Sequence, residues 1–479
     1  MTTEPTRALP SRRSVLSAAI AATGVAVAAP VLRAAPASAA GRLGDFPAGS
    51  PPTAQQPDRE LRAILAAVDR ARIEATVRRL VDFGTRHTLS SQDDPQRGIG
   101  AARDWLYDQY QEAAATSGGR MTVEKQSYVQ QPAARIPVAT TITNVVATLR
   151  GSSDPNRTYL VSGHYDSRVT DVMNATDDAP GANDDASGVA VALELARVMA
   201  THKPEATIVF AAVAGEEQGL YGSTHLAQVL KDAGVDVQGM FTCDIVGSSR
   251  ADDGTRDRRT IRLFAEGVPT AETPEQAAVR QSVGGENDSP SRQLARFVRE
   301  VADNGATRGD VRFIYRRDRY LRGGDQIPFL QQGWPAARFT EPAEDFRHQH
   351  QDVRIENGVQ FGDLSEFCDF GYMATVARVN GAALWSLATA PGTPRKVNVL
   401  TDRLTNETDL VWDRGTEADL AGYEVVYRET TAPEWEHAVN VGDVTRVTLD
   451  ISKDNVFFGV RAVDRKGHHT PAAFPVPLR

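Results

Sequence analysis

Short apolar runs that alternate with helical stretches are the feature that most constrains this chain. The runs lie at 144–149, 159–163, 208–213 and 240–244, and helical stretches fall near 187–200 and 223–233. Apolar residues at three- and four-residue spacing predict further helices from residue 59 to 81, and another is expected at 98–115. This alternation predicts an α/β fold: a doubly wound, mostly parallel sheet with helices on both faces.

Beyond residue 39, composition divides the chain into three parts. Residues 40–58 are rich in Pro, Gly and Ala and are expected to be a linker, and the α/β domain should span 59–389. Within it, the polar stretch 248–291 predicts a long surface insertion. From 391 to 479 the pattern changes to short strands with frequent turns, which predicts a separate β-sandwich. Its Trp412, its Tyr-rich strand around Tyr423 and its 457–464 strand resemble a fibronectin type III module.

The first 39 residues have the pattern of an export signal. Arg12 and Arg13 precede an Ala/Val-rich run, and Ala37-Ser38-Ala39 forms a small-residue cleavage site. The arginine pair resembles a twin-arginine signal, although an ordinary secretory signal has the same general features. The apolar run is short and interrupted by Pro30, which favours a cleaved signal over a membrane anchor. We therefore expect a secreted protein without stable membrane insertion.

Charge and cysteine content exclude several classes of protein. The formal net charge is -9, so no basic surface for a nucleic-acid backbone is expected. Cys243 and Cys368 are the only cysteines, and they allow at most one disulfide and no Cys-rich metal site. Neither a disulfide scaffold nor a nucleic-acid partner is expected.

Potential metal ligands follow several of the predicted strands. They occur in five motifs: Gly163-His164-Tyr165-Asp166, Asn183-Asp184-Asp185-Ala186-Ser187-Gly188, Gly215-Glu216-Glu217, Cys243-Asp244, and His348-Gln349-His350-Gln351-Asp352. Ligands of open α/β sheets bind outside the carboxyl ends of the strands, so these motifs can converge. Histidines and carboxylates suit zinc, and a bridging carboxylate can hold two ions close together. Of two adjacent glutamates, one can coordinate while the other remains a free base.

Each motif alone also has a purely structural interpretation. His164 and His348 could be ordinary turn or surface residues, Asp184 could cap a helix, and the glutamate pair could be a solvated loop charge. Asp244 is harder to explain in this way, because a carboxylate at the end of an apolar strand needs a partner. The joint occurrence of the motifs at successive strand ends favours a metal site.

As a set, the motifs resemble the secreted co-catalytic zinc aminopeptidases of the bacterial leucyl aminopeptidase type, a family that includes glutaminyl-cyclase-like members. The resemblance covers about 59–389 and implies two zinc ions. It implies metal ligands at His164, Asp184 (bridging), Glu217, Asp244 and His348. It also implies that Glu216 is the general base and that Asp166 lies behind His164 and fixes its tautomer.

The chain departs from the family pattern at two places. Arg347 occupies a position that is often Tyr, and it is a candidate for contact with the oxyanion. Gln326, in the segment that contains Asp325, occupies a position that is commonly His; Asp325 is a candidate substrate contact. His350 lacks an Asp four residues later and is placed outside the ligand set.

The resemblance predicts a zinc aminopeptidase that acts on the N-termini of peptides or proteins. Glutaminyl cyclisation on the same scaffold is one alternative, and a non-catalytic surface-binding protein is another. The complete ligand set and the retained Glu216 favour the peptidase. A monomer is expected, and the β domain could serve as a spacer or as a tether.

Overall fold

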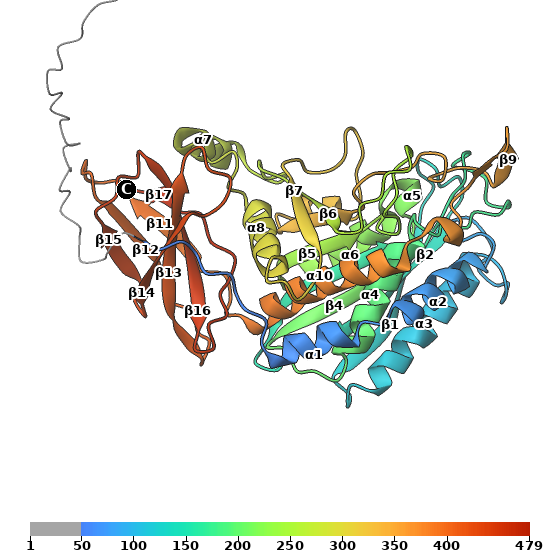
Figure 1. The fold of residues 1–479 in the computed structure, drawn as a ribbon, viewed down its shortest axis with the longest axis horizontal. Coiled ribbons are helices and arrows are strands. Elements are labelled where there is room, and N and C mark those ends of the chain that lie inside the picture. The colour runs from blue at the N-terminus through green and yellow to red at the C-terminus, as the bar shows by residue number, and fades with distance from the viewer. Residues whose placement is uncertain (1–48) are drawn as a thin grey trace, which may run out of the picture. The chain divides into compact units, whose positions relative to one another are not determined.

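A computed structural model describes residues 49–479 of the chain (Figure 1). The predicted signal peptide, 1–39, and residues 40–48 of the predicted linker lie outside the described residues. Residues 49–58 form no helix, and Ser50 makes a β-bridge with Ala438 of the C-terminal domain. Among residues 49–479, no helix has both the length and the apolar character needed to cross a membrane.

An eight-stranded mixed sheet forms the centre of the α/β domain, in the order β1-β2-β4-β3-β5-β8-β6-β7. Its strands are β1 (Met121–Gln130), β2 (Thr140–Leu149), β3 (Asp154–His164), β4 (Ala206–Val213), β5 (Asp236–Cys243), β6 (Thr260–Ala265), β7 (Asp310–Ile314) and β8 (Ala336–Thr340). The four central strands, β4, β3, β5 and β8, are parallel. The outer pairs include antiparallel ones, so the predicted α/β class is confirmed and the sheet is mixed.

Helices cover both faces of the sheet. They are α1 (Arg59–Ala67), α2 (Arg70–Val81), α3 (Ile99–Ala115), α4 (Ala186–Met199), α5 (Glu216–Gly219), α6 (Tyr221–Asp232), α7 (Pro274–Val283), α8 (Pro290–Ala302), α9 (Gln326–Gln331) and α10 (Phe370–Thr389), with a 3₁₀ turn η1 (Ser365–Phe367). Along β4, Phe210 packs in the core shared with α1–α4, α8 and α10, whereas its neighbours Val209 and Ala211 pack with α6 and α9. This period-two alternation lets one strand contribute to both cores.

The polar stretch 248–291, predicted to be a surface insertion, also contributes to the sheet. It contains β6, which pairs with β7 and β8 inside the sheet, and α7. Ile261 and Leu263 of β6 are fully buried. The strand has only six residues and includes the polar Thr260 and Arg262, so its apolar signal is weak within a polar segment.

The C-terminal β domain consists of two sheets around one core. The four-stranded sheet has the order β15-β12-β11-β17 and the three-stranded sheet the order β14-β13-β16. Their strands are β11 (Arg395–Leu400), β12 (Thr408–Asp413), β13 (Leu420–Glu429), β14 (His437–Gly442), β15 (Arg446–Leu449), β16 (Val456–Asp464) and β17 (Val476–Leu478). Trp412 and Tyr423, from different sheets, are both buried in this core. The structure thus has the predicted β domain, and its likeness to fibronectin type III stays a prediction.

Buried ion pairs join the two domains. Asp288, which precedes α8, pairs with Arg296 of α8 at 3.0 Å and with Arg428 of β13 at 2.6 Å. All three side chains are at most 3% exposed. A buried carboxylate needs cationic or hydrogen-bonding partners, and the β domain supplies the second cationic partner of Asp288.

Candidate metal centre

The central strands of the sheet end at one edge and deliver most of the predicted site residues there. His164 is the last residue of β3, Asp244 directly follows β5, and Glu216 and Glu217 open α5 after β4. In the parallel ladder His164 lies opposite Val213, so the ends of β3 and β4 are level. Asp184 lies in the loop before α4, and the polar segment after β8 completes the edge.

His164, Glu216 and Asp244 form the first of two groups of candidate ligands, with ligand atoms within 4.8 Å of one another. His164 Nε2 lies 4.0 Å from Asp244 Oδ1 and 3.1 Å from Asp184 Oδ1. His164 and Asp244 are buried, whereas Glu216 is half-buried. Glu216 is therefore the accessible carboxylate of this group.

Asp184, Glu217 and His350 form the second group. His350 Nε2 lies 2.9 Å from Asp184 Oδ2 and 3.0 Å from Glu217 Oε1. Asp184 therefore presents one oxygen to His164 and the other to His350, as a bridging ligand must. The structure brings the predicted residues His164, Asp184, Glu216, Glu217 and Asp244 together at one place.

The structure does not bring His348, the predicted fifth ligand, to either group, and His350 lies there instead. The His348 ring stacks on Phe367 at 3.6 Å between centroids, and its nearest carboxylate is that of Asp345 at 3.9 Å. His350 has a φ of 54°, and this left-handed turn accompanies the placement of its ring beside Asp184. The segment His348-Gln349-His350 offers two candidate ligands. The four-residue spacing to Asp352 favoured His348 in the prediction from the sequence.

Two buried carboxylates hold the ligand-bearing segments in place. The Asp166 carboxylate accepts hydrogen bonds from the backbone N–H groups of Glu216 and Glu217, at 3.3 and 3.1 Å. His164 Nδ1 lies 3.1 Å from the backbone carbonyl of Asp166 and 3.6 Å from its carboxylate, so the carbonyl is the closer partner for its tautomer. Asp185, which the sequence did not single out, accepts from the N–H groups of His164 and Gly188, both at 3.0 Å.

Arg338 is a second residue that the sequence analysis missed. It is fully buried in β8, and its guanidinium lies 2.5 Å from Asp244 Oδ2. The same guanidinium donates to the backbone carbonyl of Asp244 at 3.2 Å. A charged residue inside the strand Ala-Ala-Arg-Phe-Thr needs a buried partner, and this signal was present in the sequence.

Asp325 and Arg347, the two candidates for substrate contact, lie in different surroundings. Both carboxylate oxygens of the buried Asp325 lack a hydrogen-bond partner among the described residues. Burial raises the pKa of Asp325 to about 7. Arg347 instead pairs with Asp345 and donates to the backbone carbonyl of Asp252 at 2.9 Å. The structure therefore does not bring Arg347 to the two ligand groups.

The electrostatics of the site suit a proton acceptor. Burial raises the pKa of the Glu216 carboxyl well above its usual range; His164 opposes the shift, and the nearby carboxylates of Asp244 and Glu217 add to it. A carboxylate with a raised pKa holds a proton more readily near neutral pH.

The donor set fits zinc. The groups offer imidazole nitrogens and carboxylate oxygens, the ligands that zinc accepts, at positions compatible with a shared carboxylate. Glu217 Oε1 is buried and accepts no hydrogen bond among the described residues, although His350 lies beside it. An ion between these groups would satisfy that oxygen.

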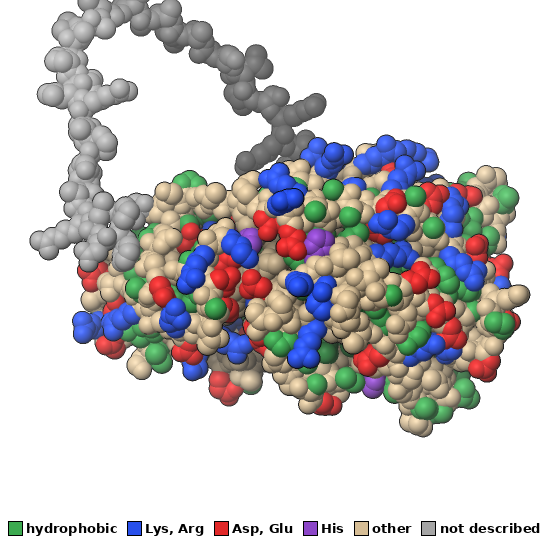
Figure 2. Space-filling model, turned by 90° about the horizontal axis from the view of Figure 1, so that it is seen from below, with side chains coloured by type: hydrophobic (Ala, Val, Ile, Leu, Met, Phe, Trp, Pro, Cys, Tyr) green, Lys and Arg blue, Asp and Glu red, His purple; other side chains and the backbone are tan. Residues whose placement is uncertain are grey.

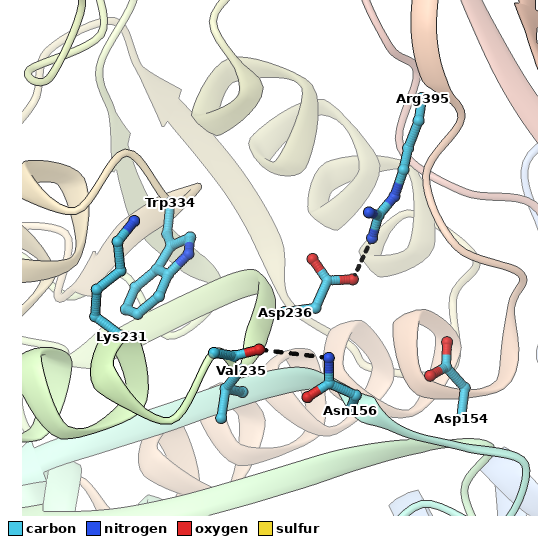
Figure 3. A pocket seen from close by; sticks show the side chains of 8 residues that line it. Asp154, Asn156, Lys231, Val235, Asp236, Trp334 and Arg395 are labelled. Atoms are coloured by element: carbon cyan, nitrogen blue, oxygen red, sulfur yellow. Dashed lines mark hydrogen bonds and ion pairs between the residues drawn. The ribbon is translucent and has the colours of Figure 1, made fainter.

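Another cavity lies at the opposite, amino ends of the strands. It has a volume of about 470 Å³ and is lined by Asp154, Asp236, Trp334 and Arg395, among others (Figure 3). Asp236 is already paired with Arg395 at 2.6 Å. Neither candidate metal group of the described residues lies there.

The face in Figure 2 mixes acidic and basic side chains, with hydrophobic ones scattered between them.

Comparison with known proteins gives a family match and several similar proteins. The model of peptidase family M28 matches residues 144–357. A protein of Pyrenophora teres f. teres (strain 0-1), named "Probable zinc metalloprotease", is 57% identical over 425 residues, 88% of this chain and 88% of the relative. A Pyricularia oryzae (strain 70-15) protein of the same name is 56% identical over 437 residues, 90% of this chain and 87% of the relative. The crystal structure of Legionella pneumophila LapA, 18% identical, covers 70% of this chain and 78% of that chain with a TM-score of 0.51, which shows a shared fold.

Proposed function

Because this chain belongs to peptidase family M28, we propose that it is a zinc-dependent aminopeptidase that hydrolyses the N-terminal peptide bond of peptides or proteins. The observation that carries the proposal is the position of Asp184 between His164 and His350, with one oxygen toward each. His164, Asp184 and Asp244 would hold one zinc ion, and Asp184, Glu217 and His350 the other. Bound zinc would lower the pKa of a water molecule and polarise the peptide carbonyl.

Glu216 is the general base in this proposal. Its carboxylate belongs to the first group, is half-buried and has a raised pKa, so it can accept a proton from the attacking water and pass it to the leaving amine. The buried carboxylate of Asp166 holds the N–H groups at the start of α5 and so fixes the direction of both glutamates. Arg338 positions Asp244 through a buried ion pair.

The experiment combines metal analysis with kinetics. We expect about two zinc ions per purified chain and release of chromophore from a panel of aminoacyl anilides. Glu216→Gln should keep its metal and lose nearly all turnover, since only the proton acceptor is removed. Bound zinc with no cleavage of any anilide, together with cyclisation of N-terminal glutamine, would instead assign the chain to the glutaminyl cyclase type.

Secretion is a separate part of the proposal. Residues 1–39 have the sequence of an export signal of the twin-arginine type. N-terminal sequencing of protein from the culture medium should begin near residue 40, and replacement of Arg12 and Arg13 by Lys should abolish export if the twin-arginine pathway is used. Unaltered export of the double variant would favour an ordinary secretory signal.

A further inference from the structure

A basic cavity opens beside the two ligand groups. It has a volume of about 430 Å³, and it is bordered by the start of α2, the segment after β5, η1 and the start of α10. Its lining includes five arginines, Arg70, Arg250, Arg256, Arg258 and Arg347. Only three carboxylates line the cavity, so its arginines outnumber its acidic residues. This excess of positive charge lies in a chain whose net charge is -9. We call it the arginine pocket.

Three of these arginines have no carboxylate partner among the residues that the structure describes. Arg347 pairs with Asp345, and Arg258 Nε lies 2.8 Å from Asp369. For Arg70, Arg250 and Arg256, no carboxylate oxygen of residues 49–479 lies within 4.0 Å of the guanidinium nitrogens, and these side chains are exposed. Free guanidinium groups around a cavity bind carboxylates through paired N–H donors.

The arginine pocket adjoins the metal centre. Ser248, Asp345, His348 and Phe367 line both the arginine pocket and a narrower cavity that reaches Asp184. The stacked rings of His348 and Phe367 form part of the wall between them. Gln349, the next residue, donates a hydrogen bond to Asp184 at 3.1 Å. This is the place of His348 in the fold: it separates the ligand groups from the free arginines.

We propose that the arginine pocket binds a carboxylate of the peptide substrate, on one of the first few residues after the cleaved bond. The carboxylate is either an acidic side chain or the C-terminal carboxylate of a short peptide. This rests on the proposed function, because it assumes a peptide held at the metal groups. Each residue of extended peptide adds about 3.5 Å of reach, so successive residues can enter an adjacent cavity.

The test compares matched peptides that carry the N-terminal residue preferred in the anilide panel. The peptides are an Xaa-Ala-Gln amide, an Xaa-Ala-Glu amide and an Xaa-Ala-Gln free acid. We expect wild-type kcat/KM to be about tenfold higher for at least one of the carboxylate peptides than for the neutral amide, as for one charge-assisted hydrogen bond. The two carboxylate peptides show whether the side chain or the chain terminus is bound. Raising the salt concentration should reduce the preference.

Arg250→Gln combined with Arg256→Gln should abolish this preference and leave kcat/KM for the neutral amide unchanged. The matched control is Arg465→Gln, an exposed arginine of the β domain whose side chain makes no hydrogen bond or ion pair among the described residues. Equal kcat/KM for all three peptides in the wild type, or a preference that survives the double variant, would overturn the proposal.

A binding experiment separates this proposal from the proposed function. Calorimetric titration with succinate needs no turnover, and we expect weaker binding to the double variant than to wild type and Arg465→Gln. If no form cleaves any peptide, the aminopeptidase assignment fails, whereas succinate binding still tests the pocket. Absence of succinate binding, or tighter binding of inorganic phosphate than of succinate, would contradict a carboxylate site.

Discussion

At the scale of single residues, the two histidines of the segment after β8 are expected to respond differently to substitution. His350→Ala should lose one of the two zinc ions, because its ring lies between Asp184 and Glu217. Loss of residues that only support a ligand already costs roughly 10–100-fold in metal affinity or activity, so loss of a direct ligand should cost more. Metal analysis and anilide kinetics of the purified variant measure both effects.

His348→Ala is the control, since its ring is also an imidazole two residues away but stacks on Phe367. It should keep both zinc ions and most of its activity. Loss of zinc from His348→Ala with retention by His350→Ala would restore the ligand assignment made from the sequence.

Backbone geometry explains why some of these site residues could be predicted from the sequence and others could not. His164 and Asp244 come at the ends of apolar strands, so their convergence needs only a parallel sheet. His350 depends on a left-handed residue in an irregular segment, which no periodicity encodes. Arg338 gave a local signal as a charge in a buried strand, but its partner Asp244 is 94 residues away in the chain.

At the scale of elements, the short helix α5 depends on one carboxylate. Asp166→Asn keeps the shape of the side chain but removes the charge that accepts from the N–H groups of Glu216 and Glu217. Hydrogen bonds to charged groups contribute about 1.5–3 kcal/mol, so we expect turnover to fall roughly 10–100-fold with zinc retained. Anilide kinetics with metal analysis measure this.

Thr88→Val is the milder comparison, because it removes a single donor to the same carboxylate, at 3.0 Å. Its turnover should fall less than that of Asp166→Asn. Equal turnover in wild type and Asp166→Asn would show that α5 holds the two glutamates without this carboxylate.

Periodicity predicted the elements that are long or buried and failed for β6. The helix expected at 98–115 is α3, Ile99–Ala115, and the strand expected at 208–213 lies within β4, Ala206–Val213. β6 has six residues inside a polar segment and pairs with strands far away in the sequence. Its position depends on tertiary pairing, which local sequence does not reveal.

At the scale of the whole molecule, the β domain is expected to stabilise the α/β domain. Arg428→Met leaves the buried Asp288 with Arg296 and Gln293 as its side-chain partners. Because Asp288 keeps Arg296, the variant loses one charge-assisted hydrogen bond, which should cost about 1.5–3 kcal/mol, and urea should unfold it at a lower concentration. Arg414→Gln, which breaks the exposed pair with Asp443, should leave the urea concentration at the unfolding midpoint nearly unchanged. Equal stability of Arg428→Met and wild type would favour a loosely attached tether.

The pH dependence of this domain contact depends on Glu300 of α8. Its carboxylate lies 2.8 Å from His469 Nε2 and 3.2 Å from Arg461 of β16. Burial opposes ionisation, but His469 and Arg461 outweigh it and lower the pKa of Glu300. A lowered folded-state pKa contributes stability above the unfolded value of about 4.3, and this contribution is lost as the pH falls through the folded value.

Glu300→Gln should therefore be less stable than wild type at neutral pH, by about 1–3 kcal/mol for a lost charged hydrogen bond. The difference should persist down to about pH 5 and shrink as the pH falls below about 4, because wild-type Glu300 then becomes protonated as well. Urea unfolding at a series of pH values measures the difference directly, and titrating groups that do not contact Glu300 cancel between the two proteins. A difference that stays constant from neutral to acidic pH would mean that the Glu300 charge adds no stability and that the variant acts through packing alone.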